Sequence, residues 1–171
     1  ATGETDLATN GTQYAIGVYT NTTAAYNAGN TWQNFTTSTA PGAGNFESGK
    51  GYQMAAKGSA SGTGVGAEMT FSGLPNTGTK TISIINSETG VSNQPSDGSR
   101  FNLVGNPYPS FISVSAFLSA NSSVLGSGFD VYGWNGSSYT TYNSASGAYI
   151  APGQGFMVGA DSSSSATLGF T

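Results

Sequence analysis

An internal repeat is the feature of this sequence that most constrains its fold. Residues 49–56 have the sequence Gly-Lys-Gly-Tyr-Gln-Met-Ala-Ala, and residues 153–160 have the sequence Gly-Gln-Gly-Phe-Met-Val-Gly-Ala. Each copy is followed by a loop rich in glycine and serine, and then by a strand-like segment that ends at Phe71 or Phe170. Such self-similarity indicates that one structural unit occurs twice.

The segments that precede the two motifs are also similar. A Val-Tyr dipeptide at residues 18–19 is followed by the aromatic Trp32, and a second Val-Tyr dipeptide at residues 131–132 is followed by the aromatic Tyr139. The order of apolar segments is therefore the same in both copies, although the first copy has a longer loop.

We interpret residues 1–171 as a single domain with an internal duplication. The two halves are predicted at about 10–85 and 101–171, with a polar connector at 86–100. A half of about 70 residues buries too little apolar surface to offset its chain entropy. We therefore expect the halves to share one core.

Local patterns predict mostly β-strands. Residues 80–84 alternate polar and apolar side chains, which is typical of a strand with one buried face. The same reasoning predicts strands over residues 14–19, 51–56, 68–71, 101–104, 129–134, 138–142, 155–158 and 166–170. Only residues 113–121 favour a short helix, with Ser113 or Ser115 as its N-cap and Asn121 at its end. We expect an all-β fold, a β-sandwich of two similar β-meander halves, with a pseudo-symmetric barrel as the alternative.

The strongest hairpin signal is the dipeptide Asn135-Gly136, which stands between two aromatic segments. It predicts a type I′ turn. Tyr139 is the aromatic residue nearest this turn on the returning strand, so we expect it to lie across from Trp134.

Composition excludes several kinds of chemistry. The chain has no histidine, no cysteine and only 4 Lys or Arg residues against 8 Asp or Glu residues. It therefore lacks the nucleophile systems that need His or Cys, the usual zinc sites and disulfides. Four basic residues cannot neutralise a phosphate backbone, so we expect no nucleic-acid partner. No apolar run is long enough to span a membrane, and no acidic pair has a recognisable motif for glycoside cleavage. We expect no enzymatic activity and no cofactor.

Aromatic side chains are the best candidates for a binding site. The chain has 9 Tyr, 9 Phe and 2 Trp residues, which also argues against disorder. Exposed aromatic faces can stack on sugar rings, and polar side chains can bind the hydroxyls. The candidates for stacking are Trp134, Tyr139 and Trp32, and the candidates for hydrogen bonding are Asn135, Gln154 and Arg100. The alternative is that these aromatic residues belong to the core.

A bound calcium ion is left open, because backbone carbonyls and isolated aspartates suffice in some extracellular β-domains. Asp130 and Asp161 are its weak candidate ligands. No sequence motif supports a calcium loop.

Three stretches carry a resemblance to a known family. Residues 101–110 read Phe-Asn-Leu-Val-Gly-Asn-Pro-Tyr-Pro-Ser, residues 131–136 read Val-Tyr-Gly-Trp-Asn-Gly, and residues 149–158 read Tyr-Ile-Ala-Pro-Gly-Gln-Gly-Phe-Met-Val. Together they resemble a β-rich module of large exported proteins of the Bacteroidetes, often found just before a type IX secretion sorting domain. Such modules accompany polysaccharide-degrading enzymes, proteases and adhesin-like surface proteins. The resemblance implies a secreted or cell-surface location and a non-catalytic accessory role, as part of a larger polypeptide.

Two functions are therefore expected, from different classes. The first is an accessory domain of an exported bacterial protein that binds a polysaccharide or a cell-surface glycan. The alternative is a structural or adhesive spacer domain of a large cell-surface protein, with no small ligand. Exposure of Trp134, Tyr139 and Trp32 would favour the first, and their burial would favour the second.

Overall fold

A computed structural model describes residues 7–22, 31–36, 46–58, 71, 73–87, 100–126, 128, 130–161 and 166–171. The strands are β1 (Gln13–Tyr19), β2 (Trp32–Thr36), β3 (Gln53–Met54), β4 (Lys80–Ile84), β5 (Phe101–Gly105), β6 (Ile112–Ser113), β7 (Val131–Trp134), β8 (Tyr139–Tyr142), β9 (Tyr149–Ile150), β10 (Gly155–Gly159) and β11 (Ala166–Phe170). One described helix, α2 (Val114–Ala120), lies beside them.

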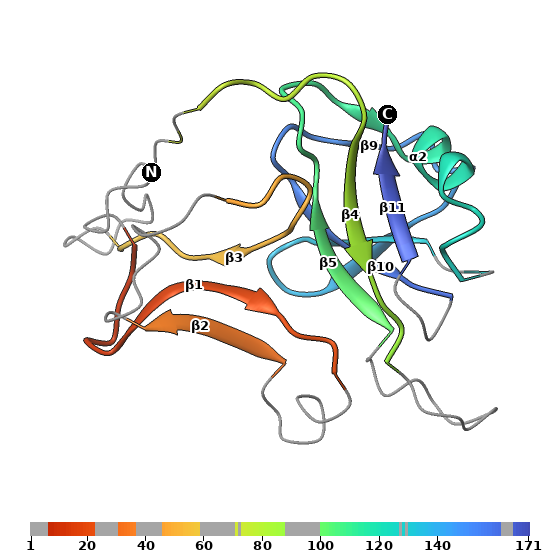
Figure 1. Cartoon of the computed structure of the whole chain (residues 1–171). Coiled ribbons are helices and arrows are strands. Elements are labelled where there is room, and N and C mark those ends of the chain that lie inside the picture. The colour runs from red at the N-terminus through yellow and green to blue at the C-terminus, as the bar shows by residue number, and fades with distance from the viewer. Residues whose placement is uncertain are drawn as a thin grey trace.

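All described strand pairs are antiparallel. A four-stranded sheet has the order β5-β10-β7-β8, and a three-stranded sheet has the order β2-β1-β3. Two smaller sheets pair β11 with β4 and β6 with β9 (Figure 1). The predicted all-β fold is therefore confirmed. The described strands do not close into the barrel that was the alternative.

The core lies between one face of the four-stranded sheet and a second layer of β4, β11, β6, β9 and α2. The sheet contributes Val104, Val131, Phe156 and Val158, and the second layer contributes Ile82, Ile84, Ile112, Val114, Phe117, Ile150, Leu168 and Phe170. At the centre, the ring of Phe117 lies 5.4 Å from that of Phe156 and 5.5 Å from that of Phe170. Phe117 of α2 thus connects the two layers, because its buried ring contacts an aromatic ring of each layer.

Helix α2 forms where the sequence predicted it. Ser113 is the N-cap, and its side chain accepts a hydrogen bond from the backbone N–H of Ala116 at 3.4 Å. Asn121 is the C-cap, and its Nδ2 donates to the carbonyl of Phe117 at 2.9 Å and to that of Gly169 at 2.9 Å. The second bond ties the end of the helix to β11.

The two predicted strand units share a pairing order. In the first, β1 pairs with β2 and with β3, and in the second, β7 pairs with β8 and with β10. Gly17 lies opposite Gln53, and Tyr132 lies opposite Met157, so the repeated motifs occupy the same place in the two units. This register makes Tyr19 the counterpart of Trp134. Comparison of the two sequences alone had matched residues 18–19 with residues 131–132, which is two residues earlier.

Two local predictions need correction. The hairpin turn is centred on Gly136 and Ser137 rather than on Asn135 and Gly136, because the N–H of Asn135 donates to the carbonyl of Ser138 at 3.1 Å. The predicted strand 51–56 is reduced to the two residues of β3, although Ala56 forms an isolated bridge with Leu7. Residues 68–70 and most of the predicted connector lie outside the described residues.

Candidate functional site

The candidate site is the outer face of the four-stranded sheet. Successive side chains of a strand point to opposite faces. On β7, Val131 and Gly133 are buried, so Tyr132 and Trp134 project from the other face. The register places Tyr139 opposite Trp134, Met157 opposite Tyr132, and Leu103 opposite Met157. With Phe101, two residues before Leu103, these six side chains define what we call the outer aromatic face: Phe101, Leu103, Tyr132, Trp134, Tyr139 and Met157.

Trp134 and Tyr139 are the most exposed members of this face. Trp134 is 57% exposed and Tyr139 is 48% exposed. Their ring centroids are 5.1 Å apart and their planes are inclined by 63°, an edge-to-face arrangement. The edge of one ring therefore covers part of the other, and the remaining ring surface is open to solvent.

A second ring pair supports this platform from the side. The rings of Phe101 and Tyr132 are 5.6 Å apart and inclined by 87°, and both residues are half-buried. Met157 lies between their strands and is only 6% exposed. None of the six side chains of the outer aromatic face is charged. The face is therefore apolar at its base and aromatic at its exposed end.

Burial raises the pKa of the Tyr139 hydroxyl above its ordinary value of 10.0. A phenol with a raised pKa stays neutral at all physiological pH values. Tyr139 therefore presents an uncharged ring and a hydroxyl that can both donate and accept a hydrogen bond.

Asn135 lies next to this platform, and its amide closes the hairpin turn. Its Oδ1 accepts from the backbone N–H groups of Ser137 at 3.0 Å and Ser138 at 2.9 Å. Its Nδ2 donates to the hydroxyls of Ser138 at 3.2 Å and Thr140 at 3.3 Å. The side chain thus positions Trp134 and Tyr139 by holding the turn between them.

Gln154 and Arg100 do not join the outer aromatic face. Oε1 of Gln154 accepts from the N–H of Ala151 at 2.8 Å, and its Nε2 lies 3.9 Å from where a Cβ on inward-facing Gly133 would be. Arg100 precedes β5 at the opposite end of the sheet from Trp134. Because β10 lies between β5 and β7, its length of about 13 Å is the distance between these two ends of the sheet.

Trp32 lies in the other sheet, in a pair that corresponds to the first. It is 39% exposed and lies directly opposite Tyr19 on β1. The two ring centroids are 5.1 Å apart and the planes are inclined by 70°. Each strand unit therefore carries one edge-to-face pair at the same position of its hairpin.

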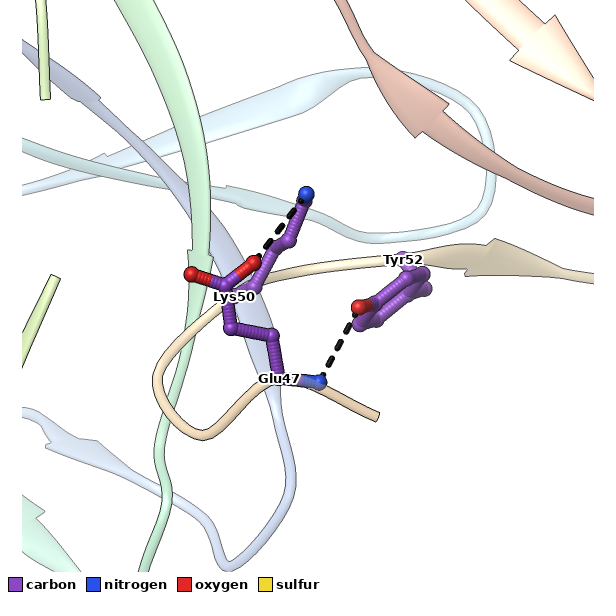
Figure 2. Close-up of polar contacts among 3 residues, drawn as sticks. All are labelled: Glu47, Lys50 and Tyr52. Carbon is purple, nitrogen blue, oxygen red and sulfur yellow. Dashed lines mark hydrogen bonds and ion pairs between the residues drawn. The ribbon is translucent and has the colours of Figure 1, made fainter. Parts of the chain in front are cut away.

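A further group of aromatic rings surrounds the loop before β3. The ring of Phe46 lies 4.9 Å from that of Tyr52 and 5.6 Å from that of Phe71, and Phe71 is 56% exposed. Figure 2 shows the polar contacts of this loop: Nζ of Lys50 lies 3.2 Å from Oε2 of Glu47, and the hydroxyl of Tyr52 accepts from the N–H of Glu47 at 3.1 Å. The ion pair is exposed and contributes little to stability.

The two acidic residues considered for calcium are Asp130, which is half-buried before β7, and Asp161, which is exposed after β10. The described residues contain no group of three or more acidic, histidine or cysteine side chains that could hold a metal ion. In the part of the chain that the structure describes, no helix has the length and apolarity needed to cross a bilayer.

Sequence reasoning missed Phe101 and Tyr132 as members of the site. The signal for Tyr132 was present, because alternation along residues 131–134 puts it on the same side as Trp134. Phe101 gave no such signal, because its neighbour across the sheet is known only from the pairing of β5 with β10 and β10 with β7.

Comparison with known families gives a match over almost the whole chain. The model of a family described as "Domain of unknown function (DUF8693)" matches residues 8–171. Neither the curated proteins nor the solved structures include a match to the chain.

Proposed function

The chain belongs to the DUF8693 family of domains of unknown function, and we propose that it is a non-catalytic accessory domain of an exported bacterial protein that binds polysaccharide. The observation that carries the proposal is the exposure of Trp134 and Tyr139 at the end of the outer aromatic face. If both rings belonged to the core, the proposal would have no basis.

The chemistry of this face fits a neutral sugar polymer. A sugar ring presents C–H groups on its flat side and hydroxyls around its edge, so it can stack on an aromatic ring while its hydroxyls form hydrogen bonds. Stacking that removes one ring face from water contributes on the order of 1–2 kcal/mol, or roughly tenfold in affinity. The absence of charge among the six side chains favours a neutral chain over a uronic-acid or sulfated polymer.

The roles proposed for individual residues follow from their positions. Trp134 and Tyr139 stack on sugar rings, and Phe101 and Tyr132 extend the apolar surface beside them. Asn135 acts mainly by holding the hairpin turn. Trp32, with Tyr19, is proposed as a second and weaker platform.

Affinity electrophoresis in gels that contain plant or algal polysaccharides tests the proposal. We expect neutral polysaccharides to retard the wild-type chain, and Trp134→Ala to lower its affinity for them by about tenfold. Phe71→Ala is the matched control, because Phe71 is 56% exposed and lies in a different group of rings. It should leave the retardation unchanged.

Two results would contradict the proposal. One is the absence of retardation by every neutral polysaccharide, and the other is equal retardation of the wild type and Trp134→Ala. Far-UV circular dichroism of both variants shows whether each is folded, so that a loss of binding can be assigned to the ring.

The second candidate function is a structural or adhesive spacer with no small ligand. The edge-to-face pairs favour it to some degree, because cross-strand aromatic pairs also stabilise hairpins by about 0.2–1 kcal/mol. In that case Trp134→Ala would lower stability without any change in polysaccharide binding.

A further inference from the structure

A hollow of about 610 Å³ lies outside the outer aromatic face. Three segments that are distant in sequence line it: residues 76–79, residues 108–113 and the end of β11, with Ala116 and Phe117 of α2 beside them. In Figure 1 the chain before β4, the start of α2 and the C-terminal end of β11 come together at the same side of the molecule. We infer that this hollow is a separate binding site for a short neutral saccharide.

Hydrogen bonds between the three segments hold the hollow open before any ligand arrives. The hydroxyl of Tyr108 lies 2.8 Å from the carbonyl oxygen of Gly78 and 2.6 Å from that of Phe170. Nδ2 of Asn76 donates to the carbonyl of Pro107 at 2.9 Å. Pre-formed concave sites of roughly 300–1,000 Å³ are typical of small-ligand binding.

The polar groups of the hollow have capacity for ligand hydroxyls. The hydroxyl of Tyr108 has one proton for the two carbonyls of Gly78 and Phe170, so the carbonyl of Gly78, which lines the hollow, keeps acceptor capacity. Thr77, Thr79 and Ser110 add exposed residues that carry hydroxyls. These groups can exchange donors and acceptors with a polyol, which carries both on each hydroxyl.

The apolar part of the lining is an aromatic ring at the surface. Phe111 is 66% exposed, whereas Phe117 and Ile112 are buried beneath the hollow. No lining residue carries a charged side chain. One open ring beside several hydroxyls, with no charged side chain in the lining, matches a neutral sugar better than it matches an ionic ligand or a wholly apolar molecule.

The test is a titration of the ¹⁵N-labelled chain with neutral hexasaccharides of glucose, xylose and mannose, followed by heteronuclear NMR. We expect the amide signals of Gly78, Phe111 and Gly169 to shift with at least one of these sugars. Phe111→Ala should weaken this response by about tenfold. Thr79→Val, which replaces a lining hydroxyl with a methyl group, should also weaken it. Phe71→Ala is the matched control, because Phe71 is also exposed, at 56%, and does not line the hollow.

The indole N–H signal of Trp134 separates this inference from the proposed function. Shifts at Gly78 and Gly169 that persist in Trp134→Ala support an independent site. Shifts at the Trp134 indole alone overturn the inference and leave the proposed function intact, whereas shifts at the hollow alone do the reverse. An absence of shifts at both places overturns the inference and the proposed function. A response in the hollow that is unchanged in Phe111→Ala and in Thr79→Val overturns the inference alone.

Discussion

Asn106 is a buried amide that holds three segments of the chain together. It is 4% exposed, and its Nδ2 contacts the carbonyls of Ser110 at 2.8 Å, Ala151 at 3.1 Å and Ile150 at 3.3 Å. Its Oδ1 accepts from the N–H of Tyr108 at 2.9 Å. It thereby fixes the Pro-Tyr-Pro turn after β5 and sets the position of Tyr108, on which the hollow depends.

We predict that Asn106→Ala destabilises the fold. The substitution removes the partner of four backbone groups, including the carbonyl of the buried Ile150, at a cost of about 1–3 kcal/mol in the free energy of unfolding. Urea denaturation followed by circular dichroism measures this. The control is Asn143→Ala, because Asn143 is exposed and its Oδ1 accepts a single bond, from Ala145. An equal free energy of unfolding in the two variants would contradict the prediction.

Buried asparagines such as Asn106 could not be predicted from the sequence. Half-buried Asn102 shows the same difficulty, because its amide donates to the carbonyl of Ile85 at 2.9 Å and accepts from the N–H of Ile85 at 3.0 Å. Through these two bonds the side chain takes the place of a neighbouring strand for the backbone of Ile85, which lies 17 residues away. Nothing local distinguishes such an amide from the many asparagines on the surface, because its partners come together only in the folded chain.

At the scale of elements, the two hairpins carry equivalent aromatic pairs. Tyr19 lies opposite Trp32 at the end of β1, and Trp134 lies opposite Tyr139 at the end of β7. The centroid distance is 5.1 Å in both pairs. The two hairpins therefore carry the same edge-to-face arrangement, although Tyr precedes Trp in the first pair and follows it in the second.

This equivalence predicts that both aromatic pairs contribute to polysaccharide binding. We expect Trp32→Ala to reduce retardation in polysaccharide gels by less than Trp134→Ala, because Trp32 is 39% exposed and Trp134 is 57% exposed. The double variant should bind more weakly than either single variant, since two platforms on one chain reinforce each other. Unchanged binding by Trp32→Ala would mean that the first pair only stabilises its hairpin.

Sequence patterns located most elements but not the connections between sheets. Residues 166–170 were predicted as a strand with the bounds of β11, because the alternation along them is a local signal. The strand predicted at 51–56 is shorter in the structure, because its residues pair with strands that are distant in sequence. Gly51 donates to the carbonyl of Leu103 on β5, whereas Gln53 and Met54 pair with β1. The chain passes from one sheet to another there, and only its distant partners determine where.

The exposure of the aromatic residues was the least predictable property of the candidate site. Alternation along residues 139–142 puts Tyr139 and Tyr142 on opposite sides of the strand, but it does not indicate which side is buried. In the fold, Tyr142 packs against the core and Tyr139 lies on the outer face. That choice depends on β4, β11 and α2, which cover the inner face of the sheet.

At the scale of the whole molecule, contacts between the two predicted halves are extensive. β4 from the first half pairs with β11 from the second over five residue pairs, and Ile82 and Ile84 lie in the same core as Phe156 and Phe170. Outside this core, Nδ2 of Asn21 in the first half donates to Oδ1 of Asn102 in the second half at 3.1 Å. Gly105 donates to the carbonyl of Gly49 at 2.9 Å, which joins the first repeated motif to β5. These bonds connect the β2-β1-β3 sheet to the core.

We therefore predict that the described sheets unfold in one cooperative transition. Trp32 and Trp134 lie in different sheets, so Trp134→Phe and Trp32→Phe each leave one fluorescent reporter, in the first or the second half. In both variants, urea denaturation should give the same midpoint by tryptophan fluorescence and by circular dichroism.

Ile84→Ala removes a buried side chain and should lower the free energy of unfolding by about 2–5 kcal/mol. Because the core is shared, this loss should be equal whether Trp32 or Trp134 reports it. If Ile84→Ala left the midpoint reported by Trp32 unchanged, the β2-β1-β3 sheet would unfold independently of the core, and the prediction would be wrong.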